Sequence, residues 1–150
     1  MRCDQCGADL PQGQTCAARF EALLASDFGG VAEAFDIHGL TVLTYRLQHP
    51  RGAKPWYLAL GYELMRRIFA QGEDWREVLL ELRQGDTVER WKRAVSAEPP
   101  GIVKGPVPGE ITIAAIDPAA PAGHTERVLA WARSVAQGRV GVGNAAASEQ

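Results

Sequence analysis

Apolar residues recur along most of the chain at spacings of three and four, which is the pattern of α-helices that bury one face. In the first such stretch, for example, Phe20, Leu23 and Leu24 fall on one side. The pattern predicts five or six helices, which span about residues 16–28, 36–49, 55–71, 74–82, 86–95 and 124–137. We therefore expect a mainly α-helical fold, arranged as a small helical bundle.

Residues that start or stop helices agree with these limits. Thr15 is suited to cap the first helix, and Pro50 stops the second, because a residue before proline is pushed out of the helical conformation. Pro55 fits the first turn of the third helix. The segments 74–77 and 86–89 each have an aspartate followed three residues later by a glutamate, and this spacing is typical of a capping box.

The chain changes character between residues 99 and 123, where prolines replace the helical pattern. Within this region, residues 110–116 alternate well enough for one short strand or an extended segment. Residues 138–150 are rich in glycine, alanine and serine, which favours disorder. We therefore expect a single domain over residues 1–137, with at most one short β element, followed by a flexible tail over residues 138–150.

Charge and composition exclude several classes of protein. With a formal net charge of -2 and an isoelectric point near 5.9, the chain lacks the basic excess of a general nucleic-acid binder. No apolar run approaches the roughly 20 residues needed to span a bilayer, and the first residues lack the layout of a signal peptide. An odd number of cysteines is a poor disulfide framework and suits a reducing compartment. We therefore expect a cytoplasmic protein that binds neither nucleic acid nor membrane.

All three cysteines lie near the start of the chain, as Cys3-x2-Cys6 followed by Cys16. A Cys-x2-Cys turn directs two thiolates into one pocket, and Gly7 supplies the backbone freedom that such a turn needs. A thioredoxin-like redox pair would need a preceding strand, for which the two residues before Cys3 leave no room. A cluster of reactive thiols is another alternative. The spacing favours zinc, since a third thiolate follows at loop distance.

Three thiolates leave one tetrahedral position open, and a histidine is suited to fill it. The first two predicted helices are joined by a short loop and should pair antiparallel. Cys16 opens the first helix, so it should lie beside the end of the second helix, which is His49. His38 should lie at the opposite end, near Asp27. The expected zinc ligands are Cys3, Cys6, Cys16 and His49. For the fourth position, His38, His124, a carboxylate and a water remain alternatives.

A metal ion with four protein ligands has no open coordination position and does not activate water, so the predicted zinc site is structural. The sequence then indicates a non-enzymatic interaction or accessory protein whose zinc-stapled N-terminus shapes a surface for a protein partner. The alternative is a metal-dependent enzyme in which His38 and Asp36, with His124, line a cleft between helices. A second metal site that joins these histidines to Asp36 or Asp117 would be compatible with a helical bundle.

Several segments of the chain carry a resemblance to a known family. They are Cys3–Gly7, Leu10–Cys16, His38–Leu43, Tyr45–Pro50 and Val128–Ala132. In these segments the chain resembles a family of small bacterial proteins catalogued only as a domain of unknown function, and the likeness covers most of the chain. The resemblance implies that the cysteines and both His38 and His49 belong to the family pattern, and that His38 has a purpose beyond packing. The family offers no established activity.

Overall fold

The expectation of a mainly α-helical bundle is confirmed. The computed structural model describes residues 2–27, 32–120 and 122–142. Within these ranges the protein has six α-helices and no strand, and Arg2 and Asp9 form an isolated antiparallel bridge. The helices are α1 (Cys16–Asp27), α2 (Ala32–Gln48), α3 (Pro55–Met65), α4 (Trp75–Leu82), α5 (Thr87–Ala94) and α6 (His124–Val135).

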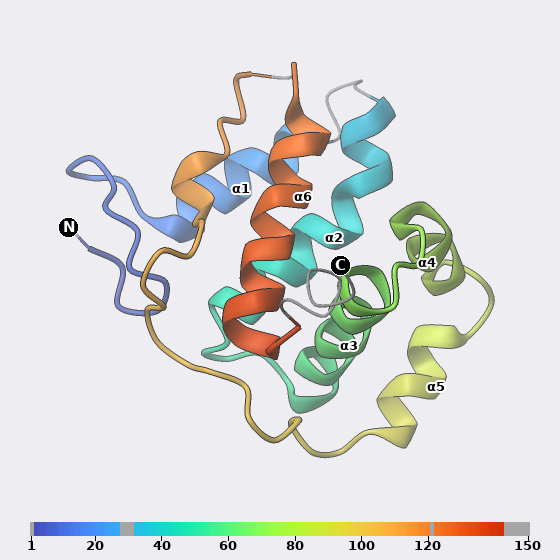
Figure 1. The fold of residues 1–150 in the computed structure, drawn as a ribbon. Helices are drawn as coiled ribbons and strands as arrows, with labels where there is room; N and C mark the ends of the chain where they lie inside the picture. Colours follow the sequence, from blue (N-terminus) through green and yellow to red (C-terminus); the bar gives the residue numbers. More distant parts are fainter. Residues whose placement is uncertain (1, 28–31, 121, 143–150) are drawn as a thin grey trace, which may run out of the picture.

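Two helices form the centre of the bundle. α2 and α6 pack side by side, and α1 and α3 both pack against α2 (Figure 1). α4 and α5 follow α3 and lie on the opposite side of the molecule from the N-terminal segment (Figure 1). The buried face of α6 is the one that the sequence pattern predicts, since Val128, Trp131 and Val135 are fully buried.

The last helix extends beyond its expected end at residue 137. A π-helical turn, Ala136–Val140, continues α6, just as the π-helical turn Arg66–Ala70 continues α3. The extension holds because Arg139 is buried within the domain, where it pairs with Glu110. The first residues of the expected tail therefore belong to the folded domain, and residues 143–150 lie outside the described residues.

The segment with the alternating pattern forms a short 3-10 helix, Ile113–Ala115, rather than a strand. The hydroxyl of Thr112 caps this turn by accepting the backbone N–H of Ala114, and Ile113 is fully buried. The backbone N–H of Ile111 donates to the hydroxyl of Ser134 on α6 at 2.8 Å. A side chain therefore accepts the hydrogen bond that a neighbouring strand would accept in a sheet. The alternation of apolar and polar residues in this segment therefore reflects burial of one of its sides, and the segment does not pair in a sheet.

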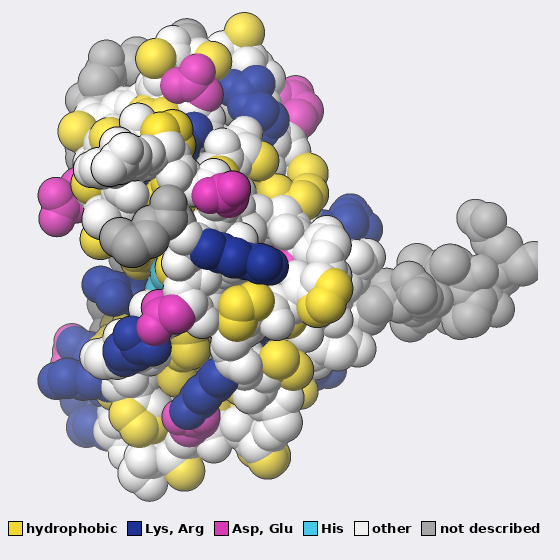
Figure 2. Space-filling view, turned by 90° about the vertical axis from the view of Figure 1, so that its left-hand side faces the viewer, with side chains coloured by type: hydrophobic (Ala, Val, Ile, Leu, Met, Phe, Trp, Pro, Cys, Tyr) yellow, Lys and Arg dark blue, Asp and Glu magenta, His cyan; other side chains and the backbone are white. Residues whose placement is uncertain are grey.

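The surface carries no dominant charge on the face shown in Figure 2, where acidic, basic and hydrophobic side chains are intermixed. This distribution agrees with the small net charge of the chain, -2. Among the described residues, no helix has the length and apolar character that crossing a bilayer requires.

Candidate metal centre

The N-terminal segment folds into a tight turn that brings two cysteines together. The backbone N–H of Gly7 donates to the carbonyl of Cys3 at 2.8 Å, and the N–H of Cys3 donates to the carbonyl of Ala8 at 2.9 Å. Gly7 has a φ of +81°, and a Cβ there would lie 3.1 Å from that of Pro106, so a larger residue would strain the turn. The N–H of Ala8 also points at the sulfur of Cys6, 3.4 Å away.

Cys16 is placed by the start of α1. The hydroxyl of Thr15 accepts the backbone N–H of Ala18 at 3.0 Å, which confirms Thr15 as the expected helix cap. The cap fixes Cys16 as the first residue of α1, where its side chain is buried and its sulfur lies 3.7 Å from that of Cys6.

His49 comes directly after α2 and is held by aromatic stacking. Its ring stacks on Tyr45, with centroids 4.2 Å apart, and Tyr45 stacks on Phe20 of α1 at 3.9 Å. This stack fixes the register of the α1–α2 pair and places the end of α2 beside the start of α1, as an antiparallel hairpin requires. Nδ1 of His49 lies 3.1 Å from the carbonyl of Tyr45 and donates to it, which leaves the lone pair on Nε2.

The four expected ligands converge on one point. One ligand atom from each of Cys3, Cys6, Cys16 and His49 lies within 4.8 Å of the others. Bonds of about 2.3 Å from a tetrahedral zinc ion would separate two sulfurs by about 3.8 Å, and the Cys6 and Cys16 sulfurs are 3.7 Å apart. Nε2 of His49 is buried with no hydrogen-bond partner. The donor set and its spacing therefore fit a tetrahedral metal ion.

Burial opposes charge on most of these groups in the protein alone. It raises the pKa of Cys6 to about 11 and also raises the pKa of Cys16, where the neighbouring thiolates add to the effect. It opposes ionisation of Cys3 as well, but hydrogen bonds from the backbone N–H groups of Cys6 and Gln5 and from the two other thiols together outweigh it and lower the pKa of Cys3. Burial lowers the pKa of His49 to about 4, which keeps its imidazole neutral, the form that binds metal.

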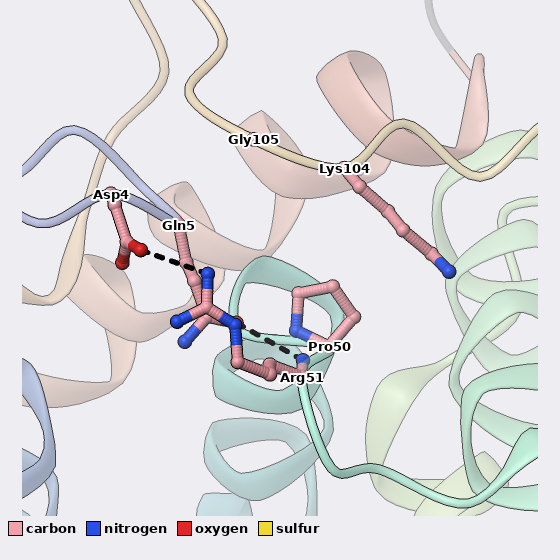
Figure 3. Close-up of a pocket in the computed structure, with 6 residues that line it drawn as sticks. All are labelled: Asp4, Gln5, Pro50, Arg51, Lys104 and Gly105. Carbon is pink, nitrogen blue, oxygen red and sulfur yellow. Dashed lines mark hydrogen bonds and ion pairs between the residues drawn. The ribbon is translucent and has the colours of Figure 1, made fainter.

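The loops that carry the ligands are also joined to each other. A cavity of about 410 Å³ beside them is lined by Asp4, Gln5, Pro50, Arg51, Lys104 and Gly105. Across it the backbone N–H of Arg51 donates to the side-chain oxygen of Gln5 at 3.0 Å, and the Arg51 guanidinium pairs with Asp4 at 2.8 Å (Figure 3). These bonds link the turn that contains Cys3 and Cys6 to the loop that follows His49.

A buried polar network beside the centre has no counterpart in the sequence analysis. Arg139 and Glu110 form an ion pair at 2.9 Å, and their side chains are 0% and 1% exposed. The Arg139 guanidinium also donates to the carbonyl of Gln5, at 3.3 Å, inside the cysteine turn. Gln48, next to His49, donates to Glu110 at 2.7 Å and accepts the indole N–H of Trp131 at 3.1 Å. The network therefore anchors both ligand-bearing segments to α6.

His38 and His124 lie away from the cysteines, as the hairpin predicts for His38. Nδ1 of His38 is 2.8 Å from the carboxylate of Asp27, and Nε2 of His124 is 3.6 Å from the same carboxylate. His38 and Asp36 were expected to line one cleft, but side chains two apart on a helix do not face each other, and His38 contacts Asp27 instead. Asp36 is exposed and lines a shallow pocket with Arg76 and Arg83 among others, while Asp117 is an exposed turn residue.

The chain also matches a known protein family. A family of unknown function, DUF5946, matches residues 1–139, which include the cysteine turn, His38 and His49. The chain belongs to DUF5946. The resemblance to a family of unknown function is thereby confirmed, and DUF5946 brings no activity with it. The chain matches no curated protein and no solved structure.

Proposed function

We propose that this DUF5946 protein binds a zinc ion through Cys3, Cys6, Cys16 and His49, and that the ion is structural. The observation that carries the proposal is the convergence of four ligand atoms within 4.8 Å. Thiolates with one imidazole favour zinc over the hard cations, which prefer oxygen ligands. Four protein ligands complete a tetrahedral sphere, so the ion has no position for a substrate.

The ion would join three separate parts of the chain. Cys3 and Cys6 come from the N-terminal turn, Cys16 from the start of α1 and His49 from the end of α2. The turn buries only a few side chains of its own, such as Ala8 and Leu10, so the metal bonds would supply much of its stability. We infer a non-enzymatic accessory protein of the cytoplasm, in which the zinc-stapled turn shapes a surface for a protein partner.

Metal retention in two histidine variants tests the zinc assignment. His49→Ala removes a ligand, and we expect it to lose zinc to a chelator at least about 100-fold faster than the wild type. Loss of a group that only hydrogen-bonds to a ligand weakens metal binding by about 10–100-fold, so loss of the ligand itself should have a larger effect. His38→Ala is the matched control, since His38 lies on the same helix but contacts Asp27 instead. Its release of zinc from the cysteine site should stay close to that of the wild type.

The measurements are elemental analysis of protein purified without added metal and the kinetics of zinc release to a coloured chelator. The cysteine site should hold about one zinc ion per chain, the stoichiometry of one tetrahedral site. Protein that is folded but free of zinc would refute the proposal. Equal zinc release from the two histidine variants would refute the assignment of His49.

A further inference from the structure

Three helices meet at the buried carboxylate of Asp27, at the end of the hairpin away from the cysteines. Asp27 ends α1, His38 belongs to α2 and His124 opens α6. The Asp27 side chain is 0% exposed, and those of His38 and His124 are 26% and 7% exposed. The charged or titratable groups that act on the Asp27 carboxyl are these two imidazoles.

The two oxygens of Asp27 have different surroundings. Oδ2 accepts a hydrogen bond from Nδ1 of His38 at 2.8 Å. Oδ1 lies 3.6 Å from Nε2 of His124, beyond the usual limit of about 3.2 Å for such a bond, and both atoms are buried without a hydrogen-bond partner. Each buried polar group without a hydrogen bond costs about 1–3 kcal/mol, and a ligand shared by the two atoms would remove this cost for both.

We propose that Oδ1 of Asp27 and Nε2 of His124 bind a divalent first-row transition metal ion, separate from the cysteine site. Bonds of about 2.1 Å to oxygen and nitrogen in a tetrahedral arrangement would place the two atoms about 3.4 Å apart, close to the 3.6 Å of the structure. A direct hydrogen bond between the same two atoms would require them to lie closer together, by about half an ångström.

His38 acts in this site as a positioning residue. Its N–H holds Oδ2 of Asp27 and thereby turns Oδ1 towards His124. Burial raises the pKa of Asp27, so in the protein alone the charged carboxylate is disfavoured, and a nearby cation would offset this cost. The site also differs in kind from the cysteine site, because its two protein ligands offer oxygen and nitrogen rather than sulfur.

Cobalt(II) titration separates the two sites, since thiolate-bound cobalt has a strong near-ultraviolet charge-transfer band that oxygen- and nitrogen-bound cobalt lacks. Metal-stripped wild-type protein should bind a first equivalent with growth of this band. It should then bind a second equivalent that changes the visible absorbance only. The charge-transfer band tests the cysteine site, and the second equivalent tests the Asp27–His124 site, so either proposal can fail alone.

Three variants assign the second equivalent. Asp27→Asn and His124→Gln should each abolish it, and His38→Gln should weaken it by about 10–100-fold, as expected for an outer partner. Asp36→Asn, a change in an exposed carboxylate of α2, should leave it unchanged. In every variant the charge-transfer band reports that the hairpin, and with it the fold, is intact. Absence of a second equivalent in the wild type, or its persistence in both Asp27→Asn and His124→Gln, would overturn the proposal.

Discussion

Replacing Glu110 by glutamine removes the negative charge that faces Arg139 inside the domain while keeping the shape of the side chain. In the wild type, Nε and Nη2 of Arg139 donate to the two carboxylate oxygens, at 3.1 Å and 2.9 Å. The two side chains are 0% and 1% exposed, so water does not screen the guanidinium once its partner is neutral. The guanidinium keeps its bonds to the carbonyls of Val103 and Gln5, at 3.2 Å and 3.3 Å.

The expected loss of stability follows from this burial. Breaking one partner of a buried ion pair costs about 3–5 kcal/mol, because the remaining charge is left uncompensated. Domains of this kind unfold with a free energy of about 5–15 kcal/mol, so the loss is a large fraction of the total. With a urea dependence of about 2 kcal/mol per molar, the midpoint of unfolding should fall by about 2 M.

Urea unfolding of the full chain, followed by circular dichroism, measures this shift of the midpoint. Excess zinc in the buffer prevents loss of metal from contributing to the shift. Asp4→Asn is the matched control, because it breaks the ion pair with Arg51, whose two side chains are each 70% exposed. Its midpoint should change little. The double variant Glu110→Gln/Arg139→Met should recover most of the loss, since it removes the buried charge itself.

The reasoning fails if Glu110→Gln shifts the midpoint no more than Asp4→Asn does. It also fails if the double variant is less stable than Glu110→Gln, since the uncompensated charge would then not be the cause of the loss.

Two further predictions concern packing and pH. A Cβ on Gly61 of α3 would lie 3.2 Å from Cγ of Leu47 on α2. Although alanine has a higher helix propensity than glycine, Gly61→Ala should lower the stability by a net of about 1–2 kcal/mol because of this close contact. An unchanged thermal midpoint would contradict this. Hydrogen bonds from Arg67 lower the pKa of Glu73 and Glu81 below their ordinary value of 4.5, so the stability that they add is present above that pH and is lost as the pH falls through their lowered values. Arg67→Gln should therefore weaken the dependence of the unfolding midpoint on pH below 4.5, and a dependence equal to that of the wild type would argue against it.

The sequence predicts the hairpin that brings the ligands together because local signals decide it. Thr15 caps α1 and places Cys16 at its start, while Pro50 limits α2 and leaves His49 at its end. Both signals act through bonds within a few residues, so their effect is visible without the rest of the fold. The antiparallel arrangement then brings the cysteines and His49 together.

The buried ion pairs depend on tertiary structure and leave no such local signal in the sequence. Glu110 lies in a segment without helical periodicity and Arg139 lies just after α6, and the packing of that segment against the end of the bundle brings them together. The contact between His38 and Asp27 also depends on tertiary structure, and the expected antiparallel hairpin places these two residues near each other. A carboxylate eleven residues away on another helix can be found only once the helix pair is aligned.

The bond from Arg139 to the carbonyl of Gln5 also has a consequence for the order of events during synthesis. The cysteines and His49 leave the ribosome long before Arg139, and the roughly 90 residues between His49 and Arg139 take about 5–20 s to translate. During that interval the nascent hairpin has its four candidate ligands but lacks the completed Glu110–Arg139 pair, whose guanidinium later bonds to the cysteine turn. If the cysteine site holds zinc as proposed, zinc supply during translation should decide how much of the chain escapes degradation, more than zinc supply after release does.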